Sequence, residues 1–149
     1  MKPLFVLLST FALSCMLSYY TKNGLVNYRL SGCIALAVMM AFTSVAHFVF
    51  WRGMMLMLPK FMPCKKEIVY LTGVIELLAA AGLLFSATRT ITGIWLIVFF
   101  VTIMPANITA ARQRVNLEKA DYTGSGIQYL WFRIPLQLLF IGWVYWFAL

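Results

Sequence analysis

The stretch from Ile68 to Asn107, IVYLTGVIELLAAAGLLFSATRTITGIWLIVFFVTIMPAN, decides the fold of this chain. It contains two apolar runs, Val69 to Phe85 and Ile91 to Met104, joined by the short polar stretch Ser86 to Thr90. A membrane-spanning helix needs about 20 mostly apolar residues, so each run, with its flanking residues, has membrane dimensions. We therefore expect a helical hairpin that crosses a bilayer twice.

The composition extends this expectation to the whole chain. Hydrophobic residues make up 63% of the 149 residues and charged residues only 11%, which is far from the average of a soluble domain. The formal net charge is +8, but the basic residues lie singly or in small clusters between apolar runs, where they act as topology signals. We expect a single integral membrane domain whose partner is the lipid bilayer and not a nucleic acid.

Five apolar runs predict an all-α polytopic membrane helix bundle, with spans at about residues 4–20, 29–51, 68–86, 91–110 and 129–148. The first run follows a short basic start and could be read as a signal peptide. No small-x-small cleavage site follows the run before the bulky Tyr19 and Tyr20, and Ala12-Leu13-Ser14-Cys15 is a poor lipobox, so a retained helix is favoured. The stretch from Arg52 to Glu67 is too short to span, and its length and two prolines favour an interfacial or re-entrant segment. Such a segment is either a connector that rests on the lipid headgroups or a functional lid.

The distribution of Lys and Arg predicts the orientation of the spans. If the five spans alternate, one side receives most of the basic residues and the other only Lys22, Arg29 and Arg89. The positive-inside rule then places the amino terminus in the cytoplasm and the carboxyl terminus outside.

Glu76 is the one acidic residue inside the central hairpin, and an ionisable residue at such a place usually faces a bundle interior with a partner. From the helical rise of about 1.5 Å per residue, Glu76 is roughly 10 Å inside its span, and four other polar residues reach the same leaflet. We expect a candidate pocket made of His47, Glu76, Asn107, Arg133 and Gln137. Its supporting residues are Thr43, Ser44, Thr72, Gly73 and Pro105.

Each member of this candidate pocket has a structural alternative. His47 can be a satisfied structural histidine, Arg133 can extend to lipid headgroups, and Asn107 can cap the end of its helix. Gln137 can bridge two helices, as buried amides often do. Glu76 is the hardest to explain in this way, because a charged carboxylate there needs His47 or Arg133 as its partner.

The three cysteines, Cys15, Cys33 and Cys64, form no CxxC pair, and no His or Cys spacing suits a structural metal. We therefore expect free thiols and no metal site. No residue pattern predicts a covalently bound cofactor.

Several motifs resemble the DoxX-like family of small bacterial membrane proteins. They are AFTSVAHF at 41–48, LPKFMP at 58–63, YLTGVIELLAAAGLL at 70–84, MPANITAA at 104–111 and WFRIPLQLLFIGWVY at 131–145. The resemblance implies a four-helix core made by spans two to five, with the first helix as an addition, and a location in the bacterial inner membrane. It also implies a link to membrane redox systems and a quinone held at His47, Glu76, Asn107 and Arg133.

Two hypotheses of function follow. The first is a quinone- or small-amphiphile-binding subunit that acts with a redox partner subunit, or as a homo-oligomer, with Glu76 and His47 handling protons. The second is a non-enzymatic accessory or scaffold protein whose buried polar residues clamp the helix bundle. A transporter is a weaker third, because five spans without a repeat do not suggest alternating access.

Overall fold

A computed structural model describes residues 2–21, 25–59 and 62–149, apart from the side chain of residue 129. Within these ranges the chain is all-helical, with one isolated bridge between Asn116 and Asp121 and no strand. The helices are α1 (Lys2–Thr21), α2 (Tyr28–Val49), α3 (Trp51–Met57), α4 (Lys65–Leu84), α5 (Ser86–Arg112) and α6 (Ile127–Ala148). Five of them, all but α3, are long and apolar enough to cross a membrane. The chain therefore has the construction of a multi-pass membrane protein.

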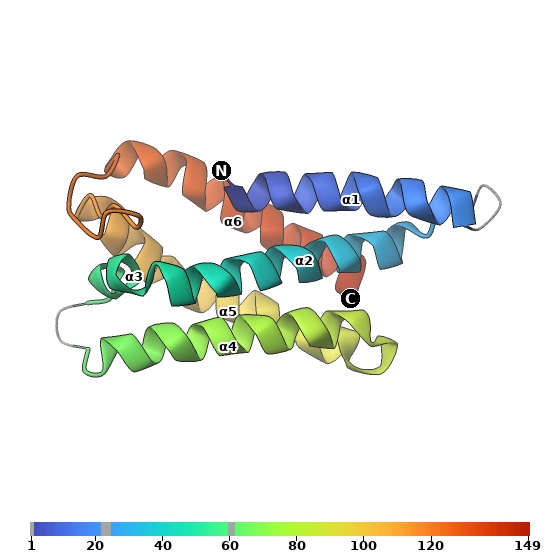
Figure 1. Ribbon diagram of the computed structural model, residues 1–149, viewed down its shortest axis with the longest axis horizontal. Coiled ribbons are helices and arrows are strands. Elements are labelled where there is room, and N and C mark those ends of the chain that lie inside the picture. The colour runs from blue at the N-terminus through green and yellow to red at the C-terminus, as the bar shows by residue number, and fades with distance from the viewer. Residues whose placement is uncertain (1, 22–24, 60–61) are drawn as a thin grey trace.

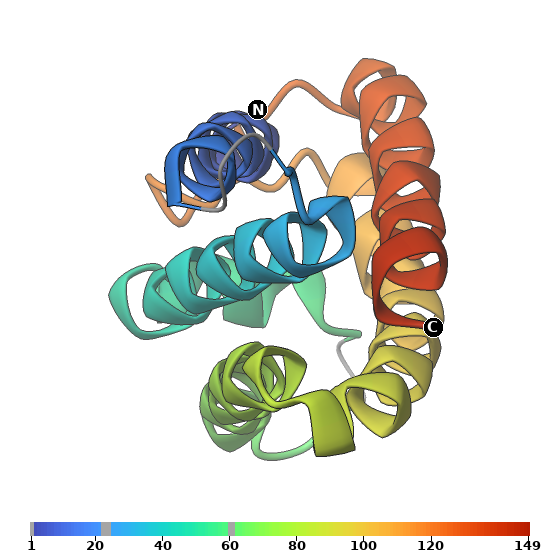
Figure 2. The same ribbon diagram turned by 90° about the vertical axis from the view of Figure 1, so that its right-hand side faces the viewer.

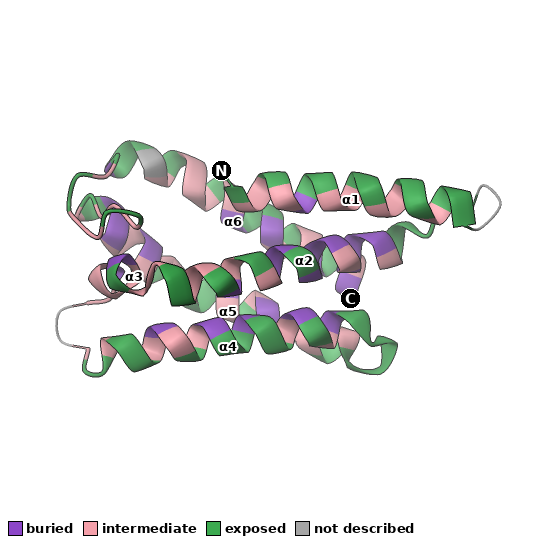
Figure 3. Ribbon diagram, viewed as in Figure 1, coloured by how far each residue is buried: buried purple, intermediate pink, exposed green. Residues whose placement is uncertain are grey.

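The long helices form two layers, with α1, α2 and α4 side by side in one and α5 and α6 in the other (Figure 2). The central helix is α2, since 44% of its apolar window is buried, against 6% for α1. Purple buried residues accordingly run along α2 where it faces its neighbours (Figure 3). The core of the bundle consists mainly of Leu36, Met39 and Met40 of α2, packed with apolar side chains of α4, α5 and α6.

One end of the bundle carries the loops that matter for the site. The short helix α3 and the segment between α5 and α6 both lie there, at the left of Figure 1. Lys2, at the start of α1, reaches the same end and contacts Glu118 with its Nζ 2.5 Å from Oε1. We call this the loop end of the bundle, and the opposite end, where α1 joins α2 and α4 joins α5, the turn end.

The stretch Ser86 to Thr90 is not the polar turn that the sequence predicts, because α5 already begins at Ser86. Only Phe85, with extended dihedrals (φ −88°, ψ 126°), separates the two helices of the hairpin. The polar side chains serve as caps instead. Thr88 Oγ1 donates to the carbonyl of Gly82 (2.9 Å) and Arg89 Nε to that of Leu83 (3.1 Å), which satisfies carbonyls left open at the end of α4.

The ends of the other helices also differ from the expected spans. The expected second span ran to residue 51, but α2 ends at Val49 because the chain bends at Phe50 and restarts as α3. At the other ends the helices are longer than their apolar runs, so α4 begins at Lys65 and α5 continues to Arg112. Hydrophobic length predicts where a chain crosses a bilayer, whereas a helix continues into water as long as its backbone bonds are kept.

Candidate functional site

His47 of α2 and Glu76 of α4 meet between the two most closely packed helices of the bundle. The Nδ1 atom of His47 lies 3.4 Å from Oε2 of Glu76, and the two side chains are 16% and 7% exposed. The pair is therefore enclosed by protein on nearly every side. A carboxyl group in such a place costs free energy unless its oxygens are hydrogen-bonded.

Small residues bring α2 and α4 close enough for this contact. A Cβ atom on Gly73 would lie 2.8 Å from Cβ of His47, so only a glycine fits between the helices at this level. Ser44 donates a buried hydrogen bond of 2.7 Å to the carbonyl of Gly73. Close approach through small residues is the usual way in which membrane helices associate.

Two threonines predicted to support the site have different positions. The hydroxyl of Thr43 donates to the carbonyl of Met40 (3.0 Å), and its oxygen faces the carboxyl group of Glu76. Thr72 donates instead to the carbonyl of Val69 in its own helix (2.8 Å). Thr43 thus belongs to the surroundings of Glu76, whereas Thr72 serves its own helix.

The hydrogen bonds of this pair are incomplete. Nδ1 of His47 lies 3.0 Å from the carbonyl oxygen of Thr43, which can only accept, so a proton on Nδ1 serves that carbonyl first. Oε2 of Glu76 is fully buried and has no hydrogen-bond partner. Oε2 of Glu76 can therefore still take up a proton or accept a hydrogen bond, and it lies beside the imidazole ring of His47.

A second polar pair lies between α5 and α6. Nδ2 of Asn107 donates to Oε1 of Gln137 at 3.0 Å, and Nε2 of Gln137 donates to the carbonyl of Phe100. Pro105 lies in the same part of α5, where it removes one backbone donor from the helix. In contrast to the carboxyl of Glu76, the side chain of Gln137 is satisfied at both its oxygen and its nitrogen.

Four of the five predicted pocket residues therefore come together as two pairs. Arg133 is half-buried on α6, one turn before Gln137, and it takes part in further interactions within the bundle. The partner of Glu76 is His47, one of the two partners that the sequence left open. Among the described residues, no hydrogen bond joins the His47–Glu76 pair to the Asn107–Gln137 pair.

Sequence reasoning missed an aromatic and cationic cluster beside the His47–Glu76 pair. Phe48 stacks on Tyr70 with a centroid distance of 5.6 Å, and Nζ of Lys66 lies 5.0 Å from the ring centre of Trp51 and 5.7 Å from that of Tyr70. The signal was present as helical spacing, since Lys66 and Tyr70 are four residues apart and so share one face. This cluster lies between the pair and the loop end, and it completes the surroundings of the site.

All three cysteines are free thiols, and Cys33 Sγ donates to the carbonyl of Phe147 at 3.1 Å. The described part of the chain holds no group of three or more His, Cys, Asp or Glu side chains suited to a metal ion. At this site the side chains of Glu76 and His47 can form hydrogen bonds and exchange protons.

A family model matches residues 36–148, which include both polar pairs and every helix from α3 onward. Its description is Domain of unknown function (DUF8561). The chain belongs to this family. No significant match to the chain is found among curated proteins or among solved structures.

The family match corrects the resemblance to the DoxX-like family. The matching model is a different one, so the DoxX-like assignment is wrong, and with it goes the link to redox systems that the resemblance implied. The motifs that carried the resemblance consist mainly of small and apolar residues, with a few prolines and single polar residues. Membrane helices of many kinds use these residues to pack, so such motifs recur without common descent.

Proposed function

We propose that this member of the family binds the polar head of a small amphipathic molecule at His47 and Glu76, and exchanges a proton with it. One observation carries the proposal. Oε2 of Glu76 is buried without a hydrogen-bond partner, 3.4 Å from the imidazole of His47. A ligand that donates a hydrogen bond to this oxygen would remove the cost of leaving it unpaired.

The chemistry of the pair limits what the ligand can be. A ligand hydroxyl can donate to Glu76, and when Glu76 is protonated it can donate to a ligand carbonyl instead. Molecules with both groups and an apolar body, such as quinols and quinones, fit this requirement. The neighbouring rings of Phe48 and Tyr70 supply apolar surface next to the pair.

The proposed location is the leaflet nearest the loop end, in a bacterial inner membrane with the amino terminus in the cytoplasm. The helix order supports this orientation, since Arg29 and Arg89 are the described basic residues at the turn end, while the other described ones lie toward the loop end. The positive-inside rule places the basic side in the cytoplasm. Lys22 and Lys60, two of the basic residues from which the sequence predicts the orientation, lie outside the described residues.

A scaffold protein is the second candidate, and one observation favours it. Both side chains of the Asn107–Gln137 pair are hydrogen-bonded, and the pair links α5 to α6, as a structural clamp should. A clamp does not explain Glu76, however, because holding two helices together favours groups whose hydrogen bonds are complete. The two functions therefore make different predictions for Glu76.

The test is native mass spectrometry of the protein purified gently from its own membrane, with extraction and identification of what remains bound. We expect a stoichiometric small amphiphile in the wild type and its loss in Glu76→Gln, which keeps the shape of the side chain but cannot take up a proton. Glu67→Gln is the matched control, because Glu67 is an exposed glutamate in the first turn of the same helix. It should retain the ligand.

Decylubiquinone, added to protein stripped of its ligand, tests the quinone class directly by the same measurement. Binding that Glu76→Gln abolishes and Glu67→Gln preserves would assign that class. If the wild type and Glu76→Gln carry the same bulk phospholipid and nothing else, the ligand-binding function is wrong and the scaffold remains.

A further inference from the structure

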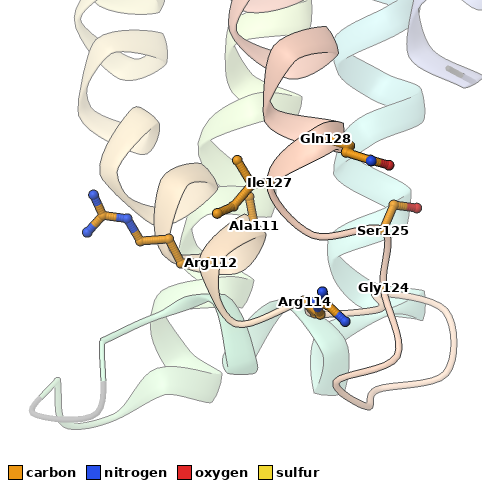
Figure 4. A pocket seen from close by; sticks show the side chains of 7 residues that line it. All are labelled: Ala111, Arg112, Arg114, Gly124, Ser125, Ile127 and Gln128. Carbon is orange, nitrogen blue, oxygen red and sulfur yellow. The ribbon is translucent and has the colours of Figure 1, made fainter.

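A second region at the loop end has the features of a binding site and takes no part in the His47–Glu76 pair. A hollow of about 500 Å³ lies between the end of α5 and the start of α6. Figure 4 shows its side chains around Ala111 and Ile127, with Arg112 on one side and Gln128 on the other. The polar residues that line it are Arg112, Arg114, Ser125 and Gln128.

The two arginines give this hollow a positive charge. Within the ranges that the structure describes, neither of them forms an ion pair, and the acidic side chains of the same loop are engaged elsewhere. Glu118 contacts Lys2, and Asp121 accepts a 2.6 Å hydrogen bond from the hydroxyl of Thr123. The hollow is therefore suited to an anion, and guanidinium groups are well matched to phosphate oxygens.

The loop holds Arg114 at this place through its backbone. The carbonyl of Arg114 accepts a 2.7 Å hydrogen bond from the backbone N–H of Gly124, which closes the loop between α5 and α6. The side chain of Arg114 then passes close to Gly126, within 3.3 Å of where a Cβ atom would be. The guanidinium group thus lies beside the first residues of α6.

A second, apolar hollow of about 400 Å³ lies along the first turns of α6. It is lined by Leu130, Trp131, Ile134 and Pro135. These residues share one side of α6 with Ile127 and Gln128, because positions three, four and seven apart lie on the same side of a helix. Trp131 is 82% exposed, as is usual for a tryptophan at the boundary between lipid and water.

We infer that the two hollows together bind one anionic glycerophospholipid, with its phosphate at Arg112 and Arg114 and an acyl chain along Trp131, Ile134 and Pro135. The position suits a lipid headgroup, since the helix α5 ends at Arg112, beyond its apolar run, and the candidate span within α6 begins at Leu130. Ser125 and Gln128 can hydrogen-bond the hydroxyl groups of a headgroup such as glycerol. Basic pockets between membrane helices at this depth are known lipid sites.

The test is native mass spectrometry of the full chain in micelles, titrated with phosphatidylglycerol. Each basic residue near an anionic headgroup contributes roughly fivefold to binding, so the double variant Arg112→Gln/Arg114→Gln should bind about 30-fold more weakly. The control is Arg52→Gln/Lys66→Gln, which removes two charges from the same end of the bundle, where they lie over Trp51. It should bind as the wild type does.

Further measurements test the same site. Circular dichroism and thermal unfolding check that the variants, whose substitutions are at exposed positions, still fold. Trp131→Ala should weaken the binding of long-chain phosphatidylglycerol and leave a dihexanoyl form unaffected. If both double variants lose lipid equally, the attraction is only a diffuse effect of charge. If glycerol phosphate at equal concentration displaces the lipid, the hollow is a site for free phosphate. Either result would overturn the inference.

Discussion

The His47–Glu76 pair between α2 and α4 and the Asn107–Gln137 pair between α5 and α6 are alike in burial and opposite in chemistry. Counted over the whole residue, backbone included, Glu76 and Gln137 are both 5% exposed. Gln137 uses its oxygen and its nitrogen in hydrogen bonds, whereas one buried oxygen of Glu76 lies beside His47 and has no hydrogen-bond partner. A neutral amide that is satisfied stabilises a bundle, and a titratable group that is unsatisfied costs stability unless function requires it.

The difference between the pairs teaches which of them is a candidate for function. In a low-dielectric surrounding the free energy of an unpaired carboxyl is high, and a packing role alone would be met better by an amide or by an apolar side chain. The Asn107–Gln137 pair is such a solution within the same protein. The contrast can be tested by substitutions, from the largest expected effect to the smallest.

The largest effect is expected where the two helices of the His47–Glu76 pair touch. Gly73→Leu should destabilise the protein by about 3 kcal/mol, the upper end for overpacking, because Cβ of His47 occupies the space that the new side chain needs. It should also separate His47 from Glu76 and release any ligand bound there. The measurement is thermal unfolding in detergent together with ligand retention by native mass spectrometry.

Gly142→Leu is the matched control for that variant, because a Cβ atom on Gly142 would meet nothing within 4 Å. Its stability should equal or exceed that of the wild type, since leucine is the better helix former. Similar losses for both variants would mean that the contact of α2 with α4 at Gly73 is not a close one.

One substitution applied to both pairs should have opposite effects. Gln137→Met removes two hydrogen bonds, the one that the amide of Asn107 donates and the one that the carbonyl of Phe100 accepts, which should cost about 2 kcal/mol. Glu76→Met replaces the unpaired carboxyl by an apolar chain of similar length and should leave stability unchanged or raise it by about 1 kcal/mol. Unfolding in graded sodium dodecyl sulfate measures both.

A double-variant cycle of Asn107→Leu and Gln137→Met isolates the bond between the two amides. Its coupling free energy should be about 1 kcal/mol, within the range measured for side-chain hydrogen bonds in membranes. Should Glu76→Met lose as much stability as Gln137→Met, the distinction between a functional and a structural pair would be lost.

The smallest effect is expected for the exposed Lys2–Glu118 pair, which contrasts with both buried pairs. The hydrogen bond from Lys2 and the charge of Lys2 hold the pKa of Glu118 below its ordinary value. A lowered pKa in the folded state means that the contact stabilises above the ordinary pKa of glutamate and is lost as the pH falls through the lowered one. Acidification should therefore release the first turn of α1 from the loop.

Hydrogen exchange of the amides at the start of α1 can follow this release as a function of pH. In Glu118→Gln the exchange should be fast at every pH and show no such transition. Because both side chains are well exposed, global stability should hardly change in either case. A transition that survives in Glu118→Gln would assign it to another group.

Much of the bundle could be predicted from hydrophobic patterning. The five long helices follow from the apolar runs, and the helix face on which Glu76 lies follows from the 3.6-residue period. The helix ends could not be predicted as well. Ser86 to Thr90 look like a turn in sequence, but a single residue, Phe85, suffices to break the helix once Thr88 and Arg89 cap the end of α4.

The residues of the candidate site could be predicted from the sequence, but which of them form pairs could not. Depth arithmetic placed five polar residues in one leaflet, but it contains no information on which helices are neighbours. That choice depends on small contacts such as Gly73 against His47 and Ser44 on the carbonyl of Gly73. The Arg-lined hollow was missed for the same reason, because Arg112 and Gln128 are brought together only by the loop that closes from Arg114 to Gly124.

The sequence by itself determined that this is an all-helical chain with the lengths and apolarity of a multi-pass membrane protein, because hydrophobicity and period act locally along the chain. The tertiary structure alone decided that Glu76 meets His47 with one oxygen unpaired, while Gln137 is satisfied by Asn107 and Phe100. The physical reason is that a hydrogen bond depends on distances of a few tenths of an ångström between different helices, and those distances are set by how the helices pack.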